Sequence, residues 1–250
     1  MVSTNEAMSG MSGVRYLDTA SAYDLWAEVY DTDANFLQAL DTIEMRILLP
    51  RVLSKLKSPT PWRVVDLGCG TGRNTGHLLA AAPANTNIIA LDLSPKMLDV
   101  ARNRLSQLQE SQGRITFQGF NILQPTASPQ GVDAIISTLV VEHTPLSVYF
   151  PAVAGMLKKG GLLLLTNMHS DMGKISQAGF VDPKTGEKIR PQSYAHSIDD
   201  IMAEALANGL EAVDAFEERM VTEENYLSLG PRAKKWVGVK VWYGGILRKM

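Results

Sequence analysis

The fold is decided by a short apolar segment that ends in three glycines, Val64-Val65-Asp66-Leu67-Gly68-Cys69-Gly70-Thr71-Gly72. Its first residues predict a strand over 63–67, and helical spacing of apolar residues follows over 74–82. Glycines between a strand and a helix let the backbone bend tightly and approach a ligand closely, because they carry no Cβ. In an open parallel sheet the ligand cleft lies outside the carboxyl ends of the strands. The segment therefore predicts a ligand site at this turn.

Strands and helices alternate around the turn. We predict seven strands, over residues 63–67, 87–91, 115–118, 132–137, 162–166, 211–218 and 239–247, and helices over residues 74–82, 96–108, 148–157 and 197–208. This alternation implies right-handed crossovers and a mostly parallel sheet. The apolar run 162–165 fits a sheet that is covered on both faces. We expect an α/β fold: a doubly wound, mostly parallel seven-stranded sheet with helices on both faces and an N-terminal helical lid.

The segments that flank this core are expected to cover the cleft. Residues 22–30 and 36–56 have helical spacing, and Pro50 is expected to kink or restart the second helix. One apolar stripe of that helix is predicted to consist of Phe36, Leu40, Ile43, Ile47 and Leu48. We expect a single domain over residues 16–250, composed of a lid over 16–60, a ligand-binding core over 62–167 and a lid or substrate insertion over 168–196, after a disordered tail over 1–15.

Composition limits the partners and the compartment. The formal net charge of −2 lacks the basic excess that phosphate binding normally leaves, so we expect neither a nucleic-acid nor a membrane partner. The one cysteine, Cys69, allows no internal disulfide, and we expect a cytoplasmic protein. The apolar runs are far shorter than the ~20 residues of a membrane helix. The histidines are scattered, and neither H-E-x-x-H nor C-x-x-C occurs, so no metal site is expected.

A second signal lies one strand beyond the glycines. Asp92 ends the predicted second strand, where a carboxylate can accept hydrogen bonds from both hydroxyls of a ribose. The two signals together predict a ligand that contains a nucleoside. The dinucleotide fingerprint G-x-G-x-x-G does not fit, because Arg73 follows the third glycine. Asp66 would also repel a pyrophosphate, whereas it could favour a cationic amino group, directly or through water.

These residues also carry a family resemblance. Residues 66–72 resemble the first motif of class I S-adenosylmethionine-dependent methyltransferases, and residues 90–98 resemble the second-strand motif of that family. Residues 133–137 with 141–143 are similar to its fourth-strand motif, and 157–161 to the turn before its fifth strand. The resemblance covers residues 62–167. Residues 23–31 are similar to a lid helix that is common in the small-molecule branch.

The resemblance implies S-adenosyl-L-methionine as the cofactor and assigns contacts to it. Gly68 and Gly70 would pass under the methionine moiety, with Asp66 near its amino group. Asp92 would hold the ribose.

The adenine contacts are less regular. Leu93 and Met97 would flank the ring, although Met97 fits ordinary helix core as well. The family often has an aspartate after the third strand, and this chain departs from that pattern. Asn121 could accept from the adenine amino group instead, or Phe120 could stack on the ring. The other expected cofactor contacts are Tyr30, Ile122 and Thr138.

Methyl transfer from a sulfonium is an in-line displacement, so the enzyme mainly aligns the acceptor and excludes water. A base is needed only where the acceptor must lose a proton, and histidine suits that task. His143 follows the fourth strand and is either such a base, a substrate contact or a structural support. The further catalytic candidates, each with a blander role in the lid, in solvent or at the start of a helix, are His169, Tyr194 and His196.

The acceptor is expected to contact aromatic residues of the lid. Tyr23 and Trp26, with Tyr30, could form a wall that excludes water, or could simply pack the first helix onto the sheet. Glu142 and His143 are the expected substrate contacts on the sheet side.

The sequence therefore favours methyl transfer to an oxygen or nitrogen of a small molecule, with specialised metabolism as a fitting context. A protein or nucleic-acid methyltransferase ranks lower, because residues 137–142 lack the N-P-P-Y type of motif. A member of the fold that does not methylate, such as a cofactor-assisted cyclase or a binding protein, is a further alternative, because fold does not fix reaction.

Overall fold

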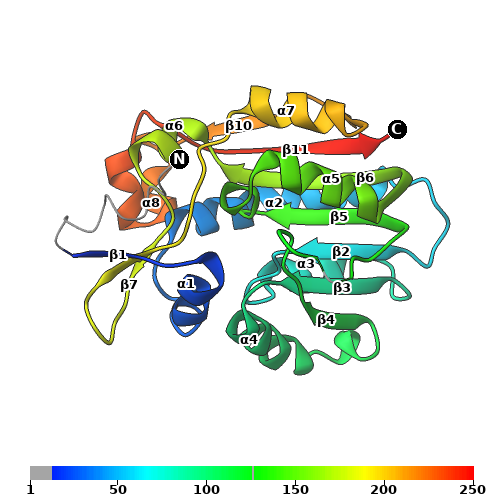
Figure 1. Ribbon diagram of the computed structural model, residues 1–250, viewed down its shortest axis with the longest axis horizontal. Coiled ribbons are helices and arrows are strands. Elements are labelled where there is room, and N and C mark those ends of the chain that lie inside the picture. The colour runs from blue at the N-terminus through cyan, green and yellow to red at the C-terminus, as the bar shows by residue number, and fades with distance from the viewer. Residues whose placement is uncertain (1–12, 126) are drawn as a thin grey trace.

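The computed structural model describes residues 13–125 and 127–250 and has the predicted α/β architecture (Figure 1). Its main sheet has the strand order β10-β11-β6-β5-β2-β3-β4, and β9 also pairs with β11. Strands β2 to β6 are parallel, whereas β11 is antiparallel to its neighbours. The strands are β2 (Arg63–Leu67), β3 (Asn87–Asp92), β4 (Ile115–Gly119), β5 (Val132–Thr138), β6 (Leu157–Met168), β9 (Leu210–Ala212), β10 (Glu217–Met220) and β11 (Lys240–Lys249).

One predicted strand is divided in two. The segment 211–218 forms β9 and β10, so that the main sheet has eight strands where the sequence predicts seven. Both short strands pair with β11. A Cβ placed on Gly245 of β11 would lie 2.4 Å from the ring of Phe216, so this ring packs directly on the glycine backbone. The chain leaves the sheet edge between the two strands and turns the Phe216 ring onto β11.

Helices cover both faces of the sheet, as a doubly wound fold requires. Leu162 and Leu164 of β6 pack in the same core cluster as residues of α2 (Phe36–Ser54) and α3 (Arg73–Ala81). Leu163 and Leu165 pack with residues of α5 (Leu146–Met156) and α7 (Ile198–Ala207) on the other face. Helix α4 (Pro95–Ser106) lies on the α2 side, where Leu98 contacts Ala90. Figure 1 shows α2 and α5 on opposite sides of β6.

The buried face of α2 differs from the predicted stripe. Ile43 and Ile47 are 41% and 58% exposed, whereas the polar residues Asp41 and Glu44 are buried. Asp41 accepts hydrogen bonds from the Thr166 hydroxyl and the Trp242 indole, and Glu44 is paired with Arg219. The prediction is confirmed for Phe36, Leu40 and Leu48, which are buried, and is wrong for Ile43 and Ile47, because buried polar residues interrupt the apolar pattern. The helix continues through Pro50.

A small lid lies beyond the carboxyl ends of the parallel strands (Figure 1). It consists of α1 (Thr19–Trp26) and a three-stranded sheet of β1 (Val14–Tyr16), β8 (Lys188–Arg190) and β7 (Phe180–Val181). The ring of Trp26 stacks on Phe180 with centroids 5.0 Å apart, which joins α1 to this sheet. The lid therefore combines the N-terminal segment with the 168–196 insertion, which also contains α6 (Ser170–Ile175).

The structure changes the predicted boundaries of the lid. Helix α2 belongs to the core layer on the sheet and not to the lid that we predict over 16–60. Of the predicted tail, residues 1–12 lie outside the described residues, and Val14 and Arg15 pair with β8. No helix in the described part of the chain is long and apolar enough to cross a membrane.

Candidate functional site

The glycine turn follows β2 and is held against the end of β3. The N–H groups of Gly68 and Cys69 both donate to the carbonyl of Leu91, at 2.8 and 2.9 Å. Gly68 has a φ of +71°, and a Cβ on it would lie 2.2 Å from Val140. Gly70 also has a positive φ, but a Cβ there would meet nothing within 4 Å. Glycine is thus required at position 68 by packing, whereas position 70 borders open space.

Asp92 is fixed beside this turn. Its carboxylate accepts hydrogen bonds from the N–H groups of Gly70 and Ser94, both at 2.8 Å. Burial raises the pKa of this carboxyl to about 6. Each oxygen keeps a lone pair for a further donor. The carboxylate is therefore already oriented to accept from two hydroxyl groups of a ligand.

A cavity of about 280 Å³ opens at the turn, and we call it the turn cavity. It lies at the carboxyl ends of β2, β3 and β5 and is covered by the start of α1. The predicted site residues that line it are Tyr23, Tyr30, Gly68, Gly70, Asp92, Leu93, Phe120, Asn121, Ile122, Thr138 and His143. Most of the expected cofactor contacts are thus brought together around one space.

Two expected cofactor contacts do not line the turn cavity. Met97 is fully buried and packs with Ala22 and Trp26 of α1, which is the core role of the alternative interpretation. Asp66 is buried, and one of its oxygens accepts from the Thr75 hydroxyl at 2.6 Å. Its other oxygen, Oδ1, has no hydrogen-bond partner among the described residues. Burial raises the pKa of Asp66 to about 6.

The predicted adenine contact at Asn121 is partly used within the protein. Its side-chain oxygen accepts from the N–H of Leu123 at 3.0 Å. Phe120 is buried, and its N–H donates to the Asp92 carbonyl, which places it next to the ribose position. The apolar side chains of Leu93 and Ile122 complete this end of the cavity.

A second cavity, of about 90 Å³, lies under the lid, and we call it the lid cavity. Tyr23, Tyr30 and Leu139 line both cavities, so the two spaces share one wall. Leu139 follows β5 with a φ of +56°, a conformation that costs energy for a residue with a Cβ. Trp26 and Glu142 line the lid cavity only.

Tyr23 and His143 form a hydrogen-bonded chain at this shared wall. Nδ1 of His143 lies 2.7 Å from the carbonyl oxygen of Gln192, so Nδ1 carries the proton and donates. Nε2 therefore accepts from the Tyr23 hydroxyl, at 2.8 Å. Burial lowers the pKa of His143 to about 4, so the imidazole is neutral near pH 7 and Nε2 can take a proton.

Glu142 lies beside this chain. Its Oε1 is 3.5 Å from Nε2 of His143, and its Oε2 has no hydrogen-bond partner in the described part of the chain. The side chain is only 4% exposed, and burial raises the pKa of Glu142 to about 8. Near pH 7 this carboxyl is therefore largely protonated, so it can both accept from and donate to a polar group of a ligand in the cavity.

The other catalytic candidates lie elsewhere. Nδ1 of His169 accepts from the Asp171 N–H at the start of α6, and Nε2 is 2.7 Å from Glu218. Tyr194 and His196 stack on each other and line a separate open hollow against α7. None of the three lines the turn or lid cavity, so His143 is the candidate base that the structure places at the site.

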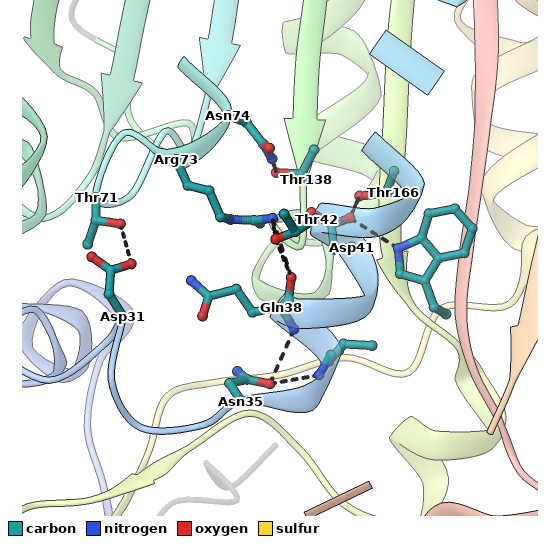
Figure 2. A network of polar contacts seen from close by, with 12 residues as sticks. Asp31, Asn35, Gln38, Asp41, Thr42, Thr71, Arg73, Asn74, Thr138 and Thr166 are labelled. Atoms are coloured by element: carbon teal, nitrogen blue, oxygen red, sulfur yellow. Dashed lines mark hydrogen bonds and ion pairs between the residues drawn. The ribbon is translucent and has the colours of Figure 1, made fainter. Parts of the chain in front are cut away.

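A buried polar network connects the lid segment, α2 and the glycine turn (Figure 2). Asp41 of α2 is fully buried and lies 2.8 Å from Arg73, the first residue of α3. At the turn itself, Thr71 donates to Asp31 at 2.9 Å, and Arg104 of α4 pairs with the same carboxylate. These contacts fix both ends of the segment that joins the lid to the core.

Several lining residues were not predicted. Ser94 caps α4 by accepting from the Met97 N–H, and this capping pattern could have indicated a position at the cleft. The lid-cavity residues have no such local signal, because they come from segments that are far apart in the sequence. The residues concerned are Asn35, Met168, Met172, Lys188, Arg232, Lys235 and Trp236.

Comparison with known proteins agrees with this geometry. A family model described as "Methyltransferase domain" matches residues 64–161. An uncharacterized methyltransferase of Emericella nidulans is 45% identical over 92% of this chain and 91% of its own length. The magnesium protoporphyrin IX methyltransferase of Synechocystis, solved with bound S-adenosylhomocysteine, is 17% identical and superposes with a TM-score of 0.61 over 93% of this chain and 96% of its own. A [4+2]-cyclase superposes with a TM-score of 0.65 at 17% identity over 95% and 99% of the two chains, which is a likeness of fold alone.

Proposed function

Because the chain belongs to the class I S-adenosylmethionine-dependent methyltransferases, we propose that it transfers the methyl group of S-adenosylmethionine to an oxygen or nitrogen of a small molecule. The observation that carries this proposal is the wall that the turn cavity and the lid cavity share, formed by Tyr23, Tyr30 and Leu139. Methyl transfer needs donor, carbon and acceptor in line and in contact. The small volume of the lid cavity favours a small acceptor over a protein or nucleic acid.

The residues of the turn cavity fit the donor. Asp92 would accept from the two ribose hydroxyls, and the open space beside Gly70 leaves room for the methionine moiety. Asp66 does not line this cavity, but its Oδ1, which has no hydrogen-bond partner among the described residues, would suit the amino group of that moiety, directly or through a water. When bound there, S-adenosylmethionine supplies an activated methyl group on a sulfonium. We place the sulfonium toward the shared wall, where the rings of Tyr23 and Tyr30 exclude water and attract a cation.

The chain of Tyr23 and His143 provides a path for a proton. As the acceptor atom takes the methyl group, its proton would pass to the Tyr23 oxygen while the Tyr23 proton moves to Nε2 of His143. The nearby Glu142 would stabilise the imidazolium where its carboxyl is ionised, which its raised pKa of about 8 places at alkaline pH. His143 then acts as a general base through Tyr23, and because burial lowers its pKa to about 4, the proton transfer depends on stabilisation of the imidazolium as it forms.

Mass spectrometry of turnover mixtures tests the proposal. The purified protein is incubated with S-adenosylmethionine and a metabolite extract, and we expect S-adenosylhomocysteine to accumulate together with one compound heavier by one methyl group. A compound transformed without any S-adenosylhomocysteine would instead identify a cyclase or another non-methylating activity.

A further inference from the structure

The lid cavity has a polar character that the methyl-transfer reaction does not itself require. Its lining includes Glu142 together with Lys188, Arg232 and Lys235. The remaining surface is mainly apolar, with Trp26 among the side chains that contribute to it. Glu142 lies beside His143, whereas Lys188 lies near Arg232 and Lys235, so the lining combines one acidic group with a group of cations.

The cations of this lining are only partly neutralised by the protein. Arg232 is 3.7 Å from Asp33 and donates to the carbonyl of the same residue. Lys188 and Lys235 have no carboxylate within 4.0 Å among the described residues. Lys188 is half-buried on β8, and Lys235 lies over the ring of Trp236 at 5.2 Å. Two ammonium groups thus border one apolar space without an acidic partner.

The electrostatic environment agrees with that geometry. Burial and the positive charges of Arg190, Lys235 and Arg232 lower the pKa of Lys188. Cations that repel one another at a cavity are stabilised by an anion bound between them. The chain brings them together from distant segments, because Lys188 belongs to the insertion and Lys235 to the 3₁₀ helix Pro231–Trp236.

Glu142 is the second polar group of this lining that a ligand can contact. Oε2 of Glu142 is buried and has no hydrogen-bond partner among residues 13–125 and 127–250, and Oε1 lies 3.5 Å from His143 at the shared wall. A ligand N–H or O–H directed at Glu142 would thus lie near the position of the methyl group. The anionic group of the same ligand would then lie near Lys188 and Lys235.

We propose that the lid cavity binds an acceptor with an anionic group, such as a carboxylate, at one end of an apolar body and the N–H or O–H to be methylated at the other. Lys188 and Lys235 recognise the anionic group, and Glu142 contacts the reacting end. This inference rests on the proposed function, since it names the class of acceptor for that reaction.

A matched pair of probes tests the inference. The full-length protein, with S-adenosylhomocysteine present, is titrated with 3-phenylpropanoate and with its neutral amide, 3-phenylpropanamide, and binding is followed by ligand-observed NMR. We expect the acid to bind about fivefold more tightly than the amide, which corresponds to ~1 kcal/mol from the two partly exposed ammonium groups together. The double variant Lys188→Met/Lys235→Met should lose this preference. The control Lys159→Met/Lys234→Met removes the same charge from residues outside the cavity lining and should keep it.

The possible results separate two kinds of failure. Equal affinity for the acid and the amide, no binding of the acid, or a preference that survives in Lys188→Met/Lys235→Met would overturn the anionic acceptor. The affinity of each protein for S-adenosylmethionine is measured by calorimetry in parallel. Normal S-adenosylmethionine binding with no acid preference rejects this inference alone, whereas absence of S-adenosylmethionine binding rejects the proposed function.

Discussion

The turn cavity and the lid cavity share a wall but are built in opposite ways. The turn cavity is formed mainly at the ends of neighbouring parallel strands, where Gly70 and Asp92 are hydrogen-bonded to each other. The lid cavity is formed by the lid, the start of α2, the insertion and residues near 235. The comparison shows that the turn cavity, which suits a common cofactor, is formed by residues that are recognisable in short stretches of sequence. The lid cavity, which faces the acceptor, is formed by residues that only the tertiary fold brings together. A change in one half should therefore leave the function of the other intact.

The largest expected effect is at the shared wall. His143→Ala should lower kcat by roughly 100-fold or more, because the proton from the acceptor loses its base. The affinity for S-adenosylmethionine should change little, since Asp92 and the glycine turn are untouched. Rates are measured with the acceptor identified by mass spectrometry. His77→Ala on α3 serves as the control, because His77 lies outside both cavity linings. An unchanged rate and pH profile would make His143 a structural support.

Removal of the Asp92 carboxylate from the turn cavity should have an effect nearly as large as that of His143→Ala. Asp92→Ala should weaken the binding of S-adenosylmethionine by roughly 50-fold, because charge-assisted hydrogen bonds to the ribose are lost. The fivefold preference of the lid cavity for an acid over its amide should persist. Calorimetry measures the first quantity, and Asp99→Ala on the exposed side of α4 is the matched control. If Asp92→Ala weakened both the binding of S-adenosylmethionine and the acid preference of the lid cavity, the two cavities would not function separately.

Substitutions of Gly68 and Gly70 should separate an effect on stability from an effect on ligand binding. Gly68→Ala should destabilise the protein by about 2 kcal/mol, because its Cβ would meet Val140 and its φ is positive. Gly70→Ala should cost only about 1 kcal/mol in stability, since nothing lies within 4 Å of its Cβ. We expect Gly70→Ala to lower affinity for S-adenosylmethionine about tenfold by filling ligand space. Thermal unfolding and calorimetry give the two numbers, and the reverse pattern would contradict the assigned roles.

The difference between the two halves also explains what could be predicted from sequence. Strand β2 has the predicted bounds, and the glycine turn with Asp92 was found because a strand end and the following turn are local features. The side chains of Lys188 and Lys235 were missed, since only the folded chain brings them to one cavity. The exposed Ile47 was assigned to the core because a simple apolar period does not anticipate the buried Asp41.

The smallest expected effect concerns Glu142, on the lid side. Burial raises its pKa to about 8, so between its ordinary pKa near 4.5 and pH 8 the folded protein binds more protons than the unfolded chain. Its contribution to stability is therefore highest at low pH and declines as pH rises through this window. Glu142→Gln should be more stable than the parent at pH 8, by on the order of 1 kcal/mol, and equal to it near pH 5. Denaturant unfolding at both pH values measures this difference. If Glu142→Gln were more stable than the parent by the same amount at pH 5 and pH 8, ionisation of Glu142 would not be the cause of the gain.

A crystal structure of the protein with S-adenosylhomocysteine tests the central claim most directly. We predict the ribose hydroxyls within hydrogen-bond distance of Asp92 and the sulfur facing Tyr23, Tyr30 and Leu139 at the shared wall. The account would be contradicted by the ligand in the lid cavity, or by a sulfur that faces away from that wall.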